Sequence, residues 1–246
     1  IGVLGAKGGQ GTSTVTLNLG ISINQLEKAA VICAEMTPGN GIWAQQLGLK
    51  QDGALENLLN QQSHQISADG IKKNLSSFSS GVQLLTSRTS FSSKTLYDNT
   101  SATIEIIEQL KTLGLYVILD LGIPDNNNIE RLINQCDQWI LVTDAKPGSL
   151  LKSRILLDYF KNKLTHKLPT LSVVVNHLTS QEYSASKHQI LETIADIPVT
   201  TIPYAPELGF QSVIQRQPII SIDPNHSLVE AYNQLARKIV VLKENG

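Results

Sequence analysis

The sequence is poor in charged residues, aromatic residues and cysteine, and it contains no long apolar run. Of its 246 residues, 17% are charged, 5% are aromatic and two are cysteines. No apolar run approaches the roughly 18 residues that a membrane-spanning helix requires. Cys33 and Cys136 lie far apart in apolar segments. We therefore expect two reduced, buried thiols, as is usual in a cytosolic protein.

The charge and histidine patterns argue against two further classes of protein. The formal net charge is −1, which argues against a strongly basic nucleic-acid binder but leaves room for a local basic patch. The five histidines are scattered without the spacing of metal ligands, and no Cys/His cluster accompanies them. We therefore expect no metal site built from cysteine and histidine.

Strand-like and helix-like segments alternate along the chain, which predicts an α/β fold with a mostly parallel sheet and helices on both faces. No linker, internal repeat or long charge run interrupts this alternation, so we expect one domain over 1–246. The abrupt start at Ile1 suggests that an upstream segment, from a few residues to a whole domain, has been cut away. We expect strands at 1–4, 30–35, 82–86, 115–120, 138–143, 171–176 and 199–202. We expect helices at 14–26, 43–47, 54–60, 101–113, 129–135, 147–163, 184–194 and 228–242, and 71–78 is compatible with another.

Residues 5–14 read Gly-Ala-Lys-Gly-Gly-Gln-Gly-Thr-Ser-Thr and follow the first expected strand. The glycines allow a tight turn that brings backbone N–H groups close to an anion, and the helix that follows adds its N-terminus. The pattern is that of a phosphate-binding loop, in which Ser13 can offer its hydroxyl to Mg²⁺. The alternative is a glycine-rich turn that binds nothing, which three glycines in four positions make the minority interpretation.

This loop lacks its usual lysine. The position after Gly11 holds Thr12, and the only lysine of the segment is Lys7, four residues before Gly11. Threonine donates one neutral hydrogen bond where lysine places a charge on the phosphates. We therefore expect that nucleotide binding survives and that stabilisation of the transition state is weakened.

Two acidic residues end expected strands. Asp120 follows a continuous apolar run, and at the carboxyl edge of a parallel sheet it can hold Mg²⁺ directly or through water. Glu35 ends the second expected strand and is a candidate to face the terminal phosphate or its attacking water. The alternatives are a turn or N-cap aspartate and a solvated strand-end glutamate.

Two residues that end later strands are candidates for contact with a purine. Asn176 offers an amide that can donate to and accept from a base edge, and Pro203 offers apolar contact to the ring. Turn chemistry favours both residue types in any case. The last helix, 228–242, is amphipathic, which fits a membrane anchor, but its mixed charge favours docking onto the domain's own core.

Residues 7–14 resemble the deviant Walker A motif of the ParA/MinD family of P-loop ATPases, and most of the chain follows the order of motifs in that family. The resemblance implies an ATP-sandwiched homodimer in which Lys7 reaches the partner's phosphates. It places Glu35 in the second-strand acidic motif, Asp120 at Walker B with Ser13 on Mg²⁺, and Asn176 and Pro203 beside adenine. It implies phosphate contacts from Gly8, Gly9, Gln10, Gly11, Thr12, Ser13 and Thr14.

The chain departs from the family pattern at two positions, and one of them points to a particular branch of the family. Thr12 replaces the standard Walker A lysine, and Thr37 replaces the second acid of the second-strand motif. Loss of that lysine resembles the CpaE/TadZ branch, which is associated with pilus assembly. The resemblance then implies a cytoplasmic, slowly hydrolysing ATPase with protein partners, which reaches a cell pole or a membrane through them.

Two other functions stay open. One is a ParA-like partitioning ATPase that binds DNA without sequence preference, an interpretation that the net charge does not favour. Its basic patches would come from Arg131, Lys152, Arg154, Lys187, Arg216, Arg237 and Lys238. The other is a non-catalytic dimeric scaffold, which the loss of charge at Thr12 and Thr37 favours.

Overall fold

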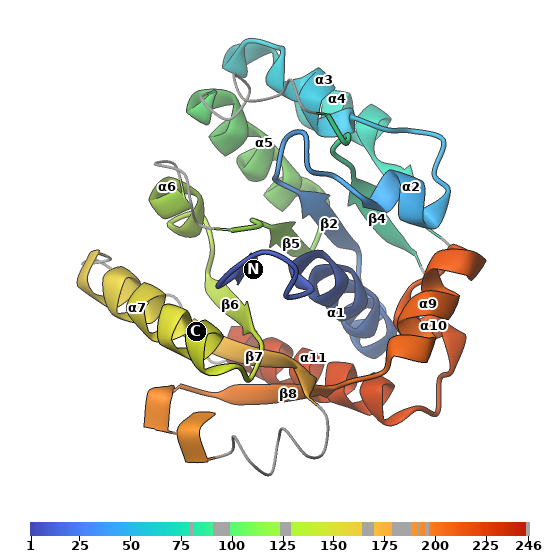
Figure 1. The fold of residues 1–246 in the computed structure, drawn as a ribbon. Coiled ribbons are helices and arrows are strands. Elements are labelled where there is room, and N and C mark those ends of the chain that lie inside the picture. The colour runs from blue at the N-terminus through green and yellow to red at the C-terminus, as the bar shows by residue number, and fades with distance from the viewer. Residues whose placement is uncertain are drawn as a thin grey trace.

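A computed structural model describes residues 1–78, 81–90, 99–123, 129–163, 170–178, 188–190, 192–194 and 197–244. An eight-stranded sheet with the order β3-β4-β2-β5-β1-β6-β7-β8 forms the centre of the molecule (Figure 1). All strand pairs are parallel except β3 with β4. The strands are β1 (Gly2–Gly5), β2 (Val31–Glu35), β3 (Ser76–Ser77), β4 (Val82–Leu85), β5 (Tyr116–Asp120), β6 (Gln138–Thr143), β7 (Thr170–Leu178) and β8 (Val199–Pro203).

Helices cover both faces of the sheet, as the alternating sequence predicts (Figure 1). Each face has its own apolar core, because alternate residues of the strands point to opposite sides. One face carries α1 (Thr12–Glu27), α2 (Trp43–Leu47), α10 (Ile219–Ile222) and α11 (Ser227–Glu244). The other carries α3 (Ala54–Leu59), α4 (Ala68–Asn74), α5 (Thr100–Leu113), α6 (Ile129–Ile133) and α7 (Pro147–Lys163).

The last helix, α11, packs against α1 and β8 rather than standing free. Tyr232, Leu235 and Ile239 on its inner side are almost fully buried. This confirms that its amphipathic pattern reflects docking onto the domain. Among the helices that the structure describes, none combines the length and the apolar character needed to span a bilayer.

The structure corrects several expected elements. The segment 71–78 is not one helix, because α4 ends at Asn74 and the chain then becomes extended in β3. Sequence patterns missed α9 (Pro206–Gln215), α10 and the short 3-10 helix Ser63–Gln65. Of the expected helix 184–194, residues 188–190 and 192–193 are helical, and 184–187 lie outside the described residues.

Candidate functional site

A cavity of about 670 Å³ opens where β1, β2 and β5 end. The carboxyl ends of parallel strands meet at one edge of a sheet, so residues distant in sequence converge there. One wall is the glycine-rich loop, and the other comes from the segments that follow β2 and β5. The lining residues are 7–14, Thr37, Asn40, Ile42 and 120–123.

The glycine-rich loop is tied to the sheet at its base and turns into α1. Gly5 N–H donates to the Gly122 carbonyl at 2.7 Å, and Ala6 N–H donates to the Val142 carbonyl at 2.9 Å. Gly9 and Gly11 have φ of 76° and 85°, conformations that favour glycine. Gly11 is the residue before α1, so the first N–H groups of that helix, which have no intrahelical acceptor, face the cavity. This arrangement is suited to an anion.

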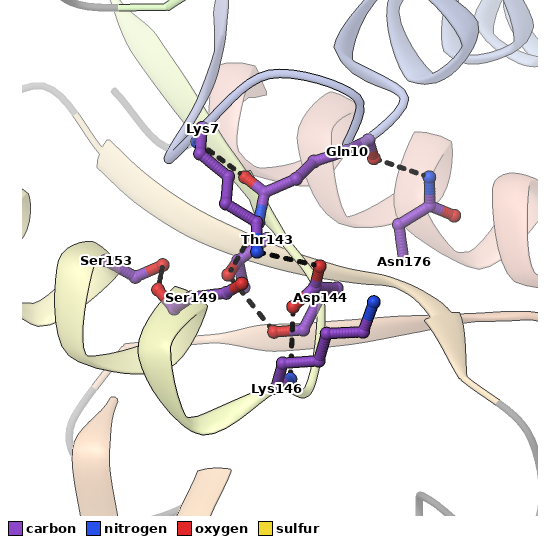
Figure 2. Close-up of polar contacts among 8 residues, drawn as sticks. All are labelled: Lys7, Gln10, Thr143, Asp144, Lys146, Ser149, Ser153 and Asn176. Carbon is purple, nitrogen blue, oxygen red and sulfur yellow. Dashed lines mark hydrogen bonds and ion pairs between the residues drawn. The ribbon is translucent and has the colours of Figure 1, made fainter.

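Gln10 connects the glycine-rich loop to the ends of β6 and β7 (Figure 2). Its side chain is 2% exposed, and its Oε1 accepts the Lys7 N–H at 2.8 Å. Its backbone carbonyl accepts a hydrogen bond from Asn176 Nδ2 at 2.9 Å, and its Nε2 lies 3.5 Å from Thr143 Oγ1. The sequence predicted a ligand contact for Gln10 and did not predict this supporting role.

The Lys7 side chain lies across the end of β6, where its Nζ is 3.6 Å from Asp144 Oδ2 (Figure 2). Partial burial works to raise the pKa of Asp144, but hydrogen bonds from Ser149 and the Lys146 N–H, with the charge of Lys7, lower it below its usual range. The Lys7 side chain keeps 40% of its surface exposed. Because water screens the partly exposed lysine end, the pair stabilises by about 1 kcal/mol at most, and Asp144 keeps its other hydrogen bonds when Lys7 leaves.

Thr12 occupies the lysine position of the loop and brings no charge. A Cβ atom on Gly5 would lie 2.5 Å from Thr12 Oγ1, so this hydroxyl packs against the end of β1. The backbone carbonyl of Thr12 accepts a hydrogen bond from Thr16 Oγ1 at 2.9 Å. At this position the loop therefore offers backbone dipoles and a hydroxyl, without a cation.

Asp120 is a buried carboxylate at the end of β5. Its side chain is 1% exposed, and burial raises its pKa to about 6, against hydrogen bonds from the Ser13 side chain and the Gly122 N–H that lower it. Ser13 and Asp120 thus meet, and both line the cavity. Hydroxyl and carboxylate oxygens are ligands that Mg²⁺ prefers, with phosphate oxygens and water completing its octahedron. These donors fit a magnesium–nucleotide complex.

Glu35 lies beside Asp120 in the sheet, but its carboxylate has backbone partners. Its Oε1 accepts the N–H groups of Ile42 and Trp43 at 2.7 and 3.0 Å, and its Oε2 accepts the Ser87 N–H at 3.0 Å. Burial raises its pKa to about 7; the three N–H groups oppose this rise and the charge of Asp120 adds to it. These contacts give Glu35 a structural role that the sequence did not predict, and a role facing the phosphate stays a prediction.

The candidates for purine contact are only partly brought to the site. Asn176 reaches the glycine-rich loop through Gln10, whereas Pro203 lies at the end of β8. The described residues that line the cavity include Gly8, Gly9, Thr12, Ser13 and Thr14 but neither Asn176 nor Pro203. No three His, Cys, Asp or Glu side chains of the described segments converge as metal ligands.

Solved structures that match this architecture include ParA and MinD ATPases. A ParA family ATPase from Chlorobium tepidum TLS matches with a TM-score of 0.82 and 19% identity, covering 96% of this chain and 97% of that one. MinD in the MinC:MinD cell division complex of Aquifex aeolicus matches with a TM-score of 0.75 and 17% identity over 97% and 95%. The septum site-determining protein MinD of Pyrococcus horikoshii OT3, complexed with Mg-ADP, matches with 0.67 and 16% over 97% and 96%.

No protein-family model and no curated protein sequence matches the chain. These structural matches extend over nearly the whole length of both chains and establish the fold. The sequence identities are below 20%, so the matches leave the activity open. The chain therefore has the α/β P-loop fold of the ParA and MinD ATPases, as its motif order predicts.

Proposed function

We propose that this chain is an ATP-binding switch of the ParA/MinD type, which pairs with a second copy of itself when MgATP is bound. The observation that carries the proposal is the contact between Ser13, at the start of α1, and the buried carboxylate of Asp120 beside a glycine-rich loop. Backbone N–H groups of residues 8–14 would bind the phosphates, and Ser13 and Asp120 would hold Mg²⁺. Mg²⁺ held there would supply positive charge to neutralise the phosphates.

Lys7 is the residue that connects nucleotide binding with dimerisation in this proposal. It is half-exposed at the mouth of the cavity, and its ion pair with Asp144 is weak enough to exchange. Thr12 carries no charge, and apart from Lys7, which pairs with Asp144, the described residues that line the cavity include no lysine or arginine for the distal phosphates. A Lys7 from the partner subunit would supply that charge only in the dimer, which would make dimerisation dependent on the triphosphate.

Hydrolysis should be slow. Thr12 carries no charge for the transition state, and Thr37 cannot orient an attacking water as a carboxylate can. We expect a turnover number far below the enzyme median of about 10 s⁻¹. The same two residues support a second candidate function, a permanently dimeric scaffold that binds nucleotide without hydrolysing it.

The proposal also includes a cellular role. The loss of the Walker A lysine favours the CpaE/TadZ branch, and therefore the assembly or placement of a pilus or secretion machine through protein partners. DNA partitioning has less support. Arg154, Arg237 and Lys238 already contact Asp158, Glu230 and the start of β8, and Lys187 lies outside the described residues.

Calorimetric titration with ATP and ADP, with and without Mg²⁺, tests nucleotide binding. We expect binding that weakens at least tenfold without Mg²⁺ and in Ser13→Ala. Ser153→Ala is the matched control, because Ser153 lies in α7 and donates to the carbonyl of Ser149. Failure of the wild-type chain to bind either nucleotide would overturn the proposal.

A further inference from the structure

Two buried carboxylates hold the segment 37–42, which forms the wall of the cavity opposite the glycine-rich loop. They are Glu35 at the end of β2 and Glu56 in the first turn of α3. Their side chains are 1% and 2% exposed, and neither lines the cavity. Buried carboxylates are costly unless they are fully hydrogen-bonded, so their partners indicate what they do.

Glu56 joins the segment 37–42 to the segment that follows β4. Its Oε1 accepts the Gly39 N–H at 3.0 Å and the Ser87 hydroxyl at 2.6 Å. Both of its oxygens accept the Arg88 N–H, at 3.2 and 3.1 Å. Each of these partners is a donor, which matches an ionised carboxylate, a group that only accepts. Glu35 makes a parallel link, because it accepts N–H groups from Trp43 and Ile42 on one oxygen and from Ser87 on the other.

The two linked segments also contact each other directly. Gly41 N–H donates to the Arg88 carbonyl at 3.3 Å, and Ser90 N–H donates to the Gly39 carbonyl at 2.9 Å. A Cβ atom on Gly41 would lie 1.9 Å from the Ser87 carbonyl oxygen, so only glycine permits this approach. The position of 37–42 is therefore set by residues that do not touch the cavity.

The wall 37–42 lies beside the turn that follows Asp120, one of the two residues that would hold Mg²⁺. A Cβ atom on Gly122 would lie 2.6 Å from Thr37 Cγ2, which places Thr37 against the turn that follows Asp120. Thr37, Asn40 and Ile42 line the cavity on this side. Ser13 and Asp120 would hold Mg²⁺, which would neutralise the charge of the distal phosphates. The glycine-rich loop would contact phosphates that ADP and ATP share, and the wall 37–42 would meet the additional phosphate.

We propose that Glu56, together with Glu35, is a positioning residue that fixes the wall 37–42 where it recognises the terminal phosphate, and so makes the site discriminate nucleoside triphosphate from diphosphate. This inference rests on the proposed function. Glu56 acts through Gly39, Ser87 and Arg88 and makes no contact with nucleotide. Loosening its hydrogen bonds therefore lowers affinity for the triphosphate and spares affinity for the diphosphate.

The test compares Glu56→Gln with the wild-type chain by titration with MgADP and with the magnesium complex of a non-hydrolysable ATP analogue. Glutamine keeps the shape but turns an amide N–H₂ toward backbone donors. We expect affinity for the analogue to fall about tenfold and affinity for MgADP to stay within twofold. Ser87→Ala, which removes the bridging hydroxyl without a charge change, should give a smaller loss in the same direction. Glu108→Gln on the exposed face of α5 is the matched control.

An equal loss for both nucleotides, or a lower unfolding temperature with an unchanged affinity ratio, would show that Glu56 serves stability alone. If Glu56→Gln does not fold, Ser87→Ala decides between these outcomes. A wild-type chain that binds both nucleotides equally would overturn the inference and leave nucleotide binding intact. A wild-type chain that binds neither would overturn the proposed function as well.

Discussion

Replacing Asp120 by asparagine should stabilise the protein at neutral pH while removing its response to Mg²⁺. Burial raises the pKa of Asp120 from 3.8 to about 6. The folded protein therefore holds this proton more tightly than the unfolded chain does. It follows that the free energy of unfolding decreases as the pH rises from about 4 to about 6, and it stays lower above that range.

The magnitude follows from the two pKa values. The difference between 3.8 and about 6 corresponds to about 3 kcal/mol at 1.36 kcal/mol per pKa unit. This is an upper bound on the free energy of unfolding that the protein loses when Asp120 ionises. Asparagine can still accept the Gly122 N–H, and it carries no charge to desolvate. We expect Asp120→Asn to raise the free energy of unfolding by about 1–3 kcal/mol at pH 7.5 and by nearly nothing at pH 4.

Urea unfolding between pH 4 and pH 8, with and without MgATP, measures this difference. MgATP should stabilise the wild-type chain much more than the variant, because a cation offsets the buried charge. Glu108→Gln is the control for the removal of an exposed carboxylate. A variant less stable than wild type at pH 7.5, or a stability difference that is constant across the pH range, would show that burial of the charged Asp120 does not destabilise the fold.

Three further substitutions test other parts of the site. Lys7→Ala should abolish dimerisation in MgATP and leave MgADP binding within a few-fold, which light scattering and calorimetry measure; a variant that still dimerises would remove Lys7 from that role. Thr12→Lys should raise the rate of phosphate release at least tenfold, since a cation then contacts the phosphates; an unchanged rate would contradict a productive ATP pose. Asn176→Ala should lower the free energy of unfolding by about 1–2 kcal/mol and weaken nucleotide binding, because the carbonyl of Gln10 loses its buried donor. Equal nucleotide affinity in wild type and this variant would show that the loop does not depend on that brace.

The sequence predicted the sheet and the loop because both are encoded locally. Buried parallel strands such as β5 and β6 are continuous apolar runs, and the loop 5–14 owes its shape to its own glycines. The helix α9 was missed although Phe210, Val213 and Ile214 have the i, i+3, i+4 spacing of a helix face; in the structure that face is exposed. Residues 71–78 differ from expectation because the pairing of β3 with β4 overrides a helical pattern after Asn74.

The candidate site was predictable in its composition and not in its contacts. The strand-end positions of Asp120 and Glu35 follow from sequence, because parallel strands end at one edge. Whether such an acid faces a cavity or the backbone depends on partners such as Ser87, which lies 52 residues from Glu35. The same holds for Gln10, whose partner Asn176 is 166 residues away.

Nucleotide-dependent dimerisation can be tested by measuring the molar mass in solution by light scattering without nucleotide, with MgADP and with MgATP. We expect a monomer in the first two conditions and a dimer in MgATP alone. A mass that is the same in all three conditions would contradict the nucleotide switch, and a constant dimer would support the scaffold in its place.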